Sequence, residues 1–205
     1  MMQALLLVMM DPPAGGDAEF NDWANLEHIP ERKNVPGFQT ALRFQNASGS
    51  PRYLAVYDLD DISILQSPAY LAISGQNLSP WSKRILAGAT ARQRFEGSRV
   101  GVVSGRGFTG SRGPIGQLLL VLWRNVRQQC DELVLKTLET AVAEARGVIQ
   151  VRGFRANRGE VRDYVGIVES TDRVSTERSR YDLPGTQACD FSQAFAPLAL
   201  TAASP

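Results

Sequence analysis

The feature that most constrains the fold of this chain is that the chain repeats itself. Three segments recur in the same order at nearly constant spacing: residues 5–10 as 118–123, 36–39 as 146–149, and 52–57 as 163–168. The offsets are 113, 110 and 111 residues. A repeat of this length predicts two structural units of one kind, because a fold pattern found twice in order rarely arises by chance.

Each half shows the same order of elements. In the first half we expect strands at 4–10, 38–44, 53–59 and 90–96, a helix at 17–29 and a broken helical stretch within 61–87 that restarts at an N-cap, Ser79, followed by Pro80. In the second half we expect strands at 117–123, 148–156, 162–169 and 187–195, a helix at 128–145 and a short helix after Asp172. The order βαββαβ is the ferredoxin-like arrangement.

The predicted fold class is therefore α+β, with two tandem ferredoxin-like βαββαβ repeats forming a pseudo-dimeric α/β barrel. The repeats are assigned to residues 1–98 and 117–205, joined by a glycine-rich linker at 99–116. The first strand of each half is almost wholly apolar, which indicates burial on both faces. We expect the two sheets to pack face to face with the helices outside, so that Leu118, Leu120 and Leu122 are buried.

Composition and charge narrow the function classes. The formal net charge is +1 and the basic residues are scattered, so the chain lacks the electrostatic footprint of a nucleic-acid-binding protein. The apolar opening is too short to span a bilayer and lacks a cleavage site. The two cysteines have no metal-ligand spacing and make no disulfide framework. These features predict a soluble cytoplasmic protein.

The glycine motif in the linker region is interpreted as a chance match to a dinucleotide-binding motif. Residues 105–110 fit the pattern G-x-G-x-x-G, the fingerprint of dinucleotide-binding proteins. That fingerprint requires a helix N-terminus directly after it, to receive the pyrophosphate. A proline and a new strand follow here instead, so we do not expect a nucleotide site.

Residues 22–31 (DWANLEHIPE), 35–38 (VPGF) and 67–71 (SPAYL) carry a family resemblance. At these segments the first half resembles the EthD-like members of the dimeric α/β-barrel superfamily. The resemblance covers about the first 95 residues, and the second half joins it through the repeat. It implies a cleft histidine at the end of the first helix, and relatives that include muconolactone-type isomerases, polyketide cyclases and decarboxylase- or dehydratase-like proteins.

His28 and Glu27 are the candidate catalytic residues. On a helical wheel they share one face with Phe20, Trp23 and Ala24, the face that the aromatic residues mark as inward. Pro30 predicts a helix end, which places His28 in the last turn, where the helix dipole favours the protonated imidazole. Such a histidine can titrate near neutrality and act as acid or base. The competing interpretation is a structural histidine bonded to a carbonyl or to Glu27.

Six further side chains are candidates for substrate binding, although each also suits a place in the core. They are Trp23, Arg43, Tyr53, Tyr57, Tyr70 and Trp81. The second half places Leu138 and Glu139 near the position of His28, so we expect a single, asymmetric site and a structural second repeat. No metal-ligand motif occurs, and we expect neither metal nor cofactor.

The sequence leaves three functions open. The first is a lyase or isomerase acting on an aromatic, polyketide-like or lactone metabolite by histidine acid–base catalysis. The second is a non-catalytic ligand-binding or accessory protein of the same fold. The third is a haem-binding protein with His28 as axial ligand, as in distant relatives. The expected partners are a small-molecule substrate and, as an open question, a second copy in a homodimer, with neither nucleic acid nor membrane.

Overall fold

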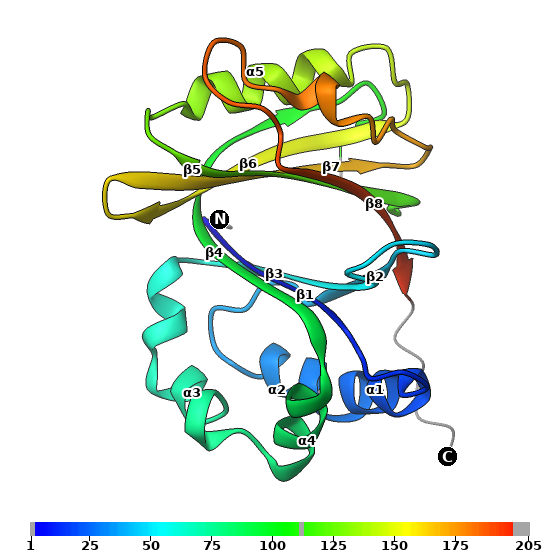
Figure 1. The fold of residues 1–205 in the computed structure, drawn as a ribbon, viewed down its shortest axis with the longest axis vertical. Coiled ribbons are helices and arrows are strands. Elements are labelled where there is room, and N and C mark those ends of the chain that lie inside the picture. Colours follow the sequence, from blue (N-terminus) through cyan, green and yellow to red (C-terminus); the bar gives the residue numbers. More distant parts are fainter. Residues whose placement is uncertain (1–2, 111–112, 199–205) are drawn as a thin grey trace. The chain divides into compact units, whose positions relative to one another are not determined.

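The computed structural model of the protein describes residues 3–110 and 113–198. The chain divides into two compact units, which are described separately (Figure 1). The first unit runs up to Glu96 and includes Leu198, and the second comprises Gly97–Pro197. In the residues described, no helix is long and apolar enough to cross a membrane.

The first unit contains an antiparallel sheet in the order β1-β3-β2. Its strands are β1 (Ala4–Asp11), β2 (Leu42–Gln45) and β3 (Tyr53–Leu59). The second strand is shorter than the predicted 38–44, because Gly37 turns the chain with a φ of +95° and only an isolated bridge joins Phe38 to Leu59. Helices α1 to α4 lie together on one side of this sheet (Figure 1).

The first helical segment continues beyond its predicted end. It comprises α1 (Asp17–Trp23), a π-helical turn (Ala24–His28) and α2 (Ile29–Lys33). In an α-helix the ring of Pro30 would collide with the carbonyl of Leu26. The π turn widens the helix just before the proline, with the Ile29 N–H donating to the carbonyl of Ala24, five residues back. The prediction that the helix ends near His28 is therefore wrong.

The second helical region is broken, as the sequence predicts. It comprises a 3₁₀ turn (Ile62–Gln66), α3 (Pro68–Leu71), a second 3₁₀ turn (Gly75–Asn77) and α4 (Pro80–Gly88). Ser79 caps α4, because its hydroxyl accepts a hydrogen bond of 2.9 Å from the Ser82 N–H.

The predicted linker begins as a strand, since residues 99–104 belong to β4. β4 (Thr90–Ser104) runs from the first unit into the second, where residues 98–104 pair with β6. The glycines there serve close packing rather than flexibility. A Cβ on Gly101 would lie 2.3 Å from Leu135, and one on Gly105 would lie 2.2 Å from the carbonyl oxygen of Val148. No helix follows the G-x-G-x-x-G segment among the described residues before β5.

The second unit contains a sheet in the order β8-β5-β7-β6-β4. Its elements are β5 (Gln117–Val126), α5 (Asp131–Ala141), β6 (Val148–Arg158), β7 (Val161–Ser170), a 3₁₀ turn (Arg178–Tyr181) and β8 (Phe191–Leu198). α5 is shorter than the predicted 128–145. The helix expected after Asp172 is a single 3₁₀ turn, and the last strand begins four residues later than predicted.

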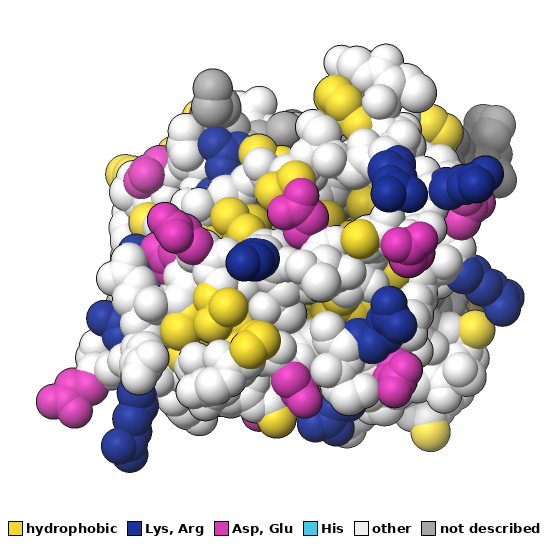
Figure 2. Space-filling view, turned by 90° about the horizontal axis from the view of Figure 1, so that it is seen from above, with side chains coloured by type: hydrophobic (Ala, Val, Ile, Leu, Met, Phe, Trp, Pro, Cys, Tyr) yellow, Lys and Arg dark blue, Asp and Glu magenta, His cyan; other side chains and the backbone are white. Residues whose placement is uncertain are grey.

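Burial of the first strands agrees with the sequence pattern. Leu118, Leu120 and Leu122 are buried, and so are the alternating residues between them. In β1, every residue from Ala4 to Met10 is buried except the half-buried Val8. Both β1 and β5 are therefore covered on both faces. The face of the molecule in Figure 2 carries Lys and Arg interspersed with Asp and Glu, so it shows no patch of a single sign.

The two sheets also share their register. Arg43 on β2 pairs with Ala55 on β3 in the first unit, and Gly153 on β6 pairs with Gly166 on β7 in the second. Gly153 lies 110 residues after Arg43, and Gly166 lies 111 residues after Ala55. These are the spacings of the sequence repeat, so matching residues occupy matching places in each sheet.

Candidate functional site

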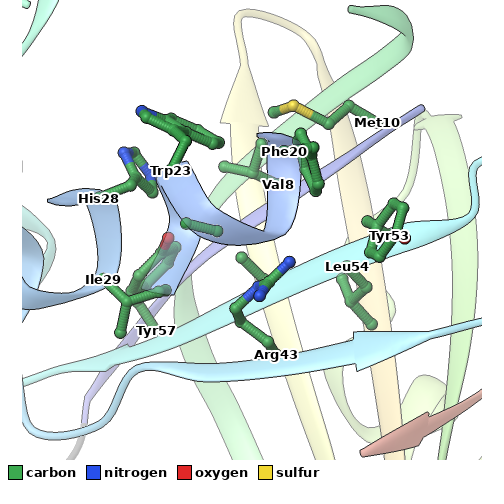
Figure 3. Close-up of a pocket in the computed structure, with 12 residues that line it drawn as sticks. Val8, Met10, Phe20, Trp23, His28, Ile29, Arg43, Tyr53, Leu54 and Tyr57 are labelled. Atoms are coloured by element: carbon green, nitrogen blue, oxygen red, sulfur yellow. The ribbon is translucent and has the colours of Figure 1, made fainter. Parts of the chain in front are cut away.

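A cavity opens in the first unit between the segment Asp17–Lys33 and the sheet (Figure 3). Its volume is about 30 Å³. Its lining is mostly apolar and comprises Val8, Met10, Phe20, Trp23, Ala24, His28, Ile29, Arg43, Tyr53, Leu54, Ala55 and Tyr57. A space of this size has room for about two water molecules or one small polar group.

His28 lies at the end of the π turn, on the wall of the cavity. Its ring packs on Trp23 with centroids 4.5 Å apart, and the ring of Tyr57 lies edge-on at 6.4 Å. The Nδ1 atom is buried, and none of the described residues offers it a hydrogen bond. A buried polar atom without a partner is uncommon and indicates a place for a water molecule or a ligand group.

The protonation state of His28 differs from the sequence-based expectation. Burial lowers the pKa of His28 well below its ordinary value, and the positive charges of Arg32, Arg43 and Arg94 lower it further. The helix continues past His28, so the favourable C-terminal dipole expected there is absent. The imidazole is therefore neutral at pH 7, the form in which one of its ring nitrogens carries a lone pair.

Tyr57 supplies the second unpartnered group of the cavity. It is 1% exposed, and its hydroxyl has no hydrogen-bond partner among the residues that the structure describes. Burial raises the pKa of Tyr57 above its ordinary value, so the phenol stays protonated. It can donate a hydrogen bond to an oxygen placed in the cavity.

Arg43 contributes a buried positive charge. Its guanidinium donates to the Oδ1 atoms of Asn25 and Asn21, each at 2.7 Å. The charge lies 5.7 Å from the ring centre of Phe20 and 5.8 Å from that of Tyr53. Burial lowers the pKa of Arg43, but an arginine remains charged at neutral pH. In Figure 3 the guanidinium rises from β2 toward the helix above the sheet.

Tyr53 lines the cavity, but its hydroxyl is already engaged. It donates to Asp17 Oδ1 at 2.6 Å and accepts from Asn21 Nδ2 at 3.2 Å. Asp17 also pairs with Arg52, and the hydrogen bond from Tyr53 is the main cause that lowers the pKa of Asp17. Tyr53 therefore supplies a wall of the cavity and fixes the start of α1.

Glu27 does not line the cavity, contrary to the helical-wheel prediction. Its carboxylate accepts hydrogen bonds from the hydroxyls of Ser79 at 2.5 Å and Ser82 at 3.0 Å. Ser82 in turn accepts from the indole N–H of Trp23 at 3.0 Å. The carboxylate joins the π turn to the N-terminus of α4, where the helix dipole favours a negative charge. It holds the wall in place rather than orienting His28.

Tyr70 and Trp81 also lie outside the cavity lining. The Tyr70 hydroxyl accepts a hydrogen bond of 2.9 Å from Arg94, and its ring stacks on Phe38. The indole N–H of Trp81 donates to Glu19 at 3.2 Å on the surface. Of the eight candidate residues, the structure thus brings five together: His28, Trp23, Arg43, Tyr53 and Tyr57.

Sequence reasoning missed the residues that shape the cavity and hold its charge. Asn21 and Asn25, spaced by one helical turn, are the partners of Arg43. Their i, i+4 spacing was a usable signal. Ala55 lies between the two tyrosines on the same face of β3, and its small side chain leaves room that the alternation of the strand did not reveal.

The second unit contains a different cavity, of about 210 Å³, near the C-terminal end of α5. It is lined by Val103, Ser104, Gly105, Arg106, Glu139, Val142, Ala143, Ala145, Val148 and Val151. Neither histidine nor an unpartnered buried polar atom lines it within the described part of the chain. Likewise, no cluster of three potential metal ligands occurs among the described residues.

Comparison with known proteins identifies the fold. No family model matches the sequence, and no curated protein matches it. Solved structures do match. An anthrone oxidase-like protein aligns with a TM-score of 0.68 at 10% identity, covering 100% of this chain and 98% of its own. A mutant chlorite dismutase from Candidatus Nitrospira defluvii, in complex with cyanide, aligns with a TM-score of 0.59 at 10% identity, covering 97% of this chain and 91% of its own.

A haem-binding protein from Thermus thermophilus aligns with a TM-score of 0.54 at 12% identity, covering 97% of this chain and 92% of its own. At these identities the matches establish the fold alone. The chain has an α+β fold of the dimeric α/β-barrel type.

A haem does not fit beside the histidine of this chain. His28 is the sole histidine in the sequence, and the cavity next to it has a volume of about 30 Å³. Pockets for drug-sized ligands hold roughly 300–1,000 Å³, and a macrocycle needs a place within that range. Trp23 covers the imidazole ring closely at 4.5 Å. The side chains around His28 therefore do not fit a haem.

Proposed function

We propose that the first unit is a small-molecule enzyme in which His28 removes a proton from an aromatic, polyketide-like or lactone metabolite. The observation that carries this proposal is the neutral His28 with an unpartnered Nδ1 atom beside the cavity. A base requires a free lone pair within reach of the substrate, and a neutral imidazole at pH 7 supplies it. The buried, unpartnered hydroxyl of Tyr57 supplies a hydrogen-bond donor nearby.

The proposed reaction begins with transfer of a substrate proton to Nδ1 of His28. The electron pair of the broken bond moves onto a conjugated oxygen, which becomes an enolate or phenolate. Tyr57 donates a hydrogen bond to that oxygen, and the charge of Arg43 stabilises it. The imidazolium then returns the proton, either to another carbon, which isomerises the substrate, or to a leaving group, which completes an elimination.

Other side chains have supporting roles in this proposal. Trp23 and Tyr53 form walls against which a planar ring can pack. Glu27 positions the segment that carries His28 by tying it to α4. Substrate contact by Tyr70 and Trp81 has no support from the geometry, since both lie outside the cavity lining.

A second candidate is oxidation of the same substrate anion by molecular oxygen. The anthrone oxidase-like protein among the structural matches favours it, as does the shared first step, since a stabilised carbanion is the form that dioxygen attacks. Oxygen consumption coupled to turnover distinguishes this reaction from isomerisation or elimination. Ligand binding without any turnover would instead favour the accessory, non-catalytic function.

We further propose that the chain is an EthD-like tandem duplication, with repeats at residues 1–98 and 117–205. The matched register of Arg43–Ala55 and Gly153–Gly166 supports this origin. So does a tyrosine–aspartate hydrogen bond at the start of the first helix in each unit: Tyr53 to Asp17 at 2.6 Å and Tyr164 to Asp131 at 2.9 Å. Homodimer formation and a cytoplasmic location stay predictions from the sequence.

The test is the His28→Ala variant, assayed for consumption of phenolic, polyketide-like and lactone substrates. Removal of a general base is expected to lower kcat by about 10²- to 10⁴-fold while leaving the melting temperature nearly unchanged. Lys33→Ala, an exposed residue of the same helix, is the matched control and should retain full activity. A His28→Ala enzyme with wild-type turnover would refute the proposal.

A further inference from the structure

Arg43 differs from the other buried arginines in its partners. Arg32 lies 3.8 Å from the carboxylate of Glu31, and Arg152 forms an ion pair of 2.7 Å with Glu169. Arg43 is equally buried at 6% exposure, yet its hydrogen bonds within the described chain go only to the neutral amides of Asn21 and Asn25. Buried charges in proteins are normally paired, because leaving a charge in a medium of low dielectric is costly.

The surroundings of Arg43 hold the guanidinium without neutralising it. Two amide oxygens and the faces of Phe20 and Tyr53 stabilise a cation partly and fix its orientation. The nearby carboxylate of Asp17 is engaged by Tyr53 and Arg52. The net result is a positive charge in the wall of an apolar cavity.

One further group of the same cavity is suited to bind an oxygen atom. The Tyr57 hydroxyl is a buried donor without a partner in the described chain. The positive charge and this donor line one cavity, whose other lining residues are mostly apolar. This combination recognises an oxyanion better than a neutral group, since a hydrogen bond to a charged partner is roughly twice as strong.

We propose that Arg43 forms an anion subsite, so that the pocket selects ligands that carry an acidic oxygen, as a carboxylate or an acidic phenol or enol. The cavity volume of about 30 Å³ suits such a head group, and the rest of a larger ligand would extend beyond it. The inference rests on the proposed function of this pocket and specifies the class of its substrate.

The experiment measures binding rather than turnover, by titration calorimetry. The probes are two pairs of matched shape, acetate with acetamide and benzoate with benzamide. We expect the full-length protein to bind each anion at least about tenfold more tightly than its amide, which corresponds to about 1.4 kcal/mol. Arg43→Gln, which retains hydrogen bonding to Asn21 and Asn25, should abolish the preference.

Two controls keep the result interpretable. Arg92→Gln removes an exposed arginine of the same unit that does not line the cavity, and it should keep the preference. Arg43→Lys restores the charge and should recover part of it if Arg43→Gln does not fold. Equal binding of acid and amide by the wild-type protein, no binding of either acid, or an unchanged preference in Arg43→Gln would each overturn the inference.

The outcomes separate this inference from the proposed catalysis. If the wild-type protein binds the anions preferentially but has no activity, the anion subsite is supported and the proposed catalysis is refuted. Turnover that is lost in His28→Ala, in a wild-type protein that binds each acid no more tightly than its amide, would reject the anion subsite and support the enzyme.

Discussion

The two units place different side chains on matching positions of similar sheets. Where the first unit has Arg43 beside Ala55, the second has a pair of glycines, Gly153 and Gly166. A Cβ on Gly166 would lie 2.7 Å from the side chain of Leu138. The leucine therefore packs directly onto the glycine backbone and leaves no cavity there. At this position the sheet carries a charge beside a cavity in the first unit and is covered by an aliphatic side chain in the second.

This difference separates framework residues from residues of the site. The tyrosine–aspartate hydrogen bond occurs in both units, so we attribute it to the framework, where it fixes the start of the first helix. The charge of Arg43 and the phenol of Tyr57 occur in the first unit only, since Val168 takes the place of Tyr57 in the register of β7. A feature that only the open unit has is a better candidate for function than one found in both.

The largest expected effect is on the filled unit. Leu138→Ala removes a fully buried side chain from the packing over Gly166 and should lower the free energy of unfolding by about 2–5 kcal/mol. Urea denaturation followed by circular dichroism measures it. Leu26→Ala is the control: Leu26 is 52% exposed, so its loss should cost less than about 0.5 kcal/mol. A Leu138→Ala cost that small would mean that the second unit is not tightly packed there.

The next prediction compares the free energy of unfolding lost when each of the two tyrosine–aspartate hydrogen bonds is removed. Tyr164→Phe should lower the free energy of unfolding by about 2 kcal/mol, because the Tyr164 hydroxyl also accepts a bond of 2.8 Å from the buried N–H of Cys130. Tyr53→Phe should cost only about 1 kcal/mol, because the Asn21 amide that donates to its hydroxyl at 3.2 Å also donates to the Asp17 carbonyl at 2.9 Å and keeps that bond. Chemical denaturation of both variants gives the two values. The reverse order would contradict the assignment of both bonds to one framework role.

The pH dependence of stability tests the environment of His28. Its pKa is lowered in the folded protein, so below about pH 6.5 the unfolded chain takes up a proton that the folded protein does not. Stability is therefore lost as the pH falls. Between about pH 7.5 and 5.5 the wild type should lose up to about 1.4 kcal/mol more than His28→Gln does. Identical slopes would show that His28 is as exposed in the folded protein as in the unfolded chain.

The smallest effect on stability is expected at Tyr57. Tyr57→Phe removes a hydroxyl without a partner in the described structure, so the free energy of unfolding should stay within about 0.5 kcal/mol of wild type or rise slightly. Turnover should fall by about 10²-fold if the hydroxyl stabilises the substrate anion. A destabilisation above about 2 kcal/mol would instead show that Tyr57 has a structural partner.

Most of the secondary structure could be predicted from the sequence. The apolar runs of β1 and β5 predicted strands buried on both faces, and both are so buried. The capping of α4 by Ser79 followed from local chemistry. The course of the chain past Pro30 did not, because a single-residue π insertion has no period of its own in the sequence. The strand through residues 98–104 was hidden by glycines whose purpose, close approach to neighbouring elements, depends on those neighbours.

The sequence by itself predicted two similar halves, and it placed the single histidine on the inward face of the first helix, where the structure has it beside the cavity. Both inferences depend only on the spacing of residues along the chain: the offset between the repeated segments and the helical periodicity of the inward face. Only the tertiary structure decided that the histidine is neutral, that Glu27 binds α4 instead of facing the cavity, and that Arg43 has no carboxylate partner among the described residues. Burial and charge pairing depend on which distant segments meet, and that information is distributed over the whole fold rather than over any one segment.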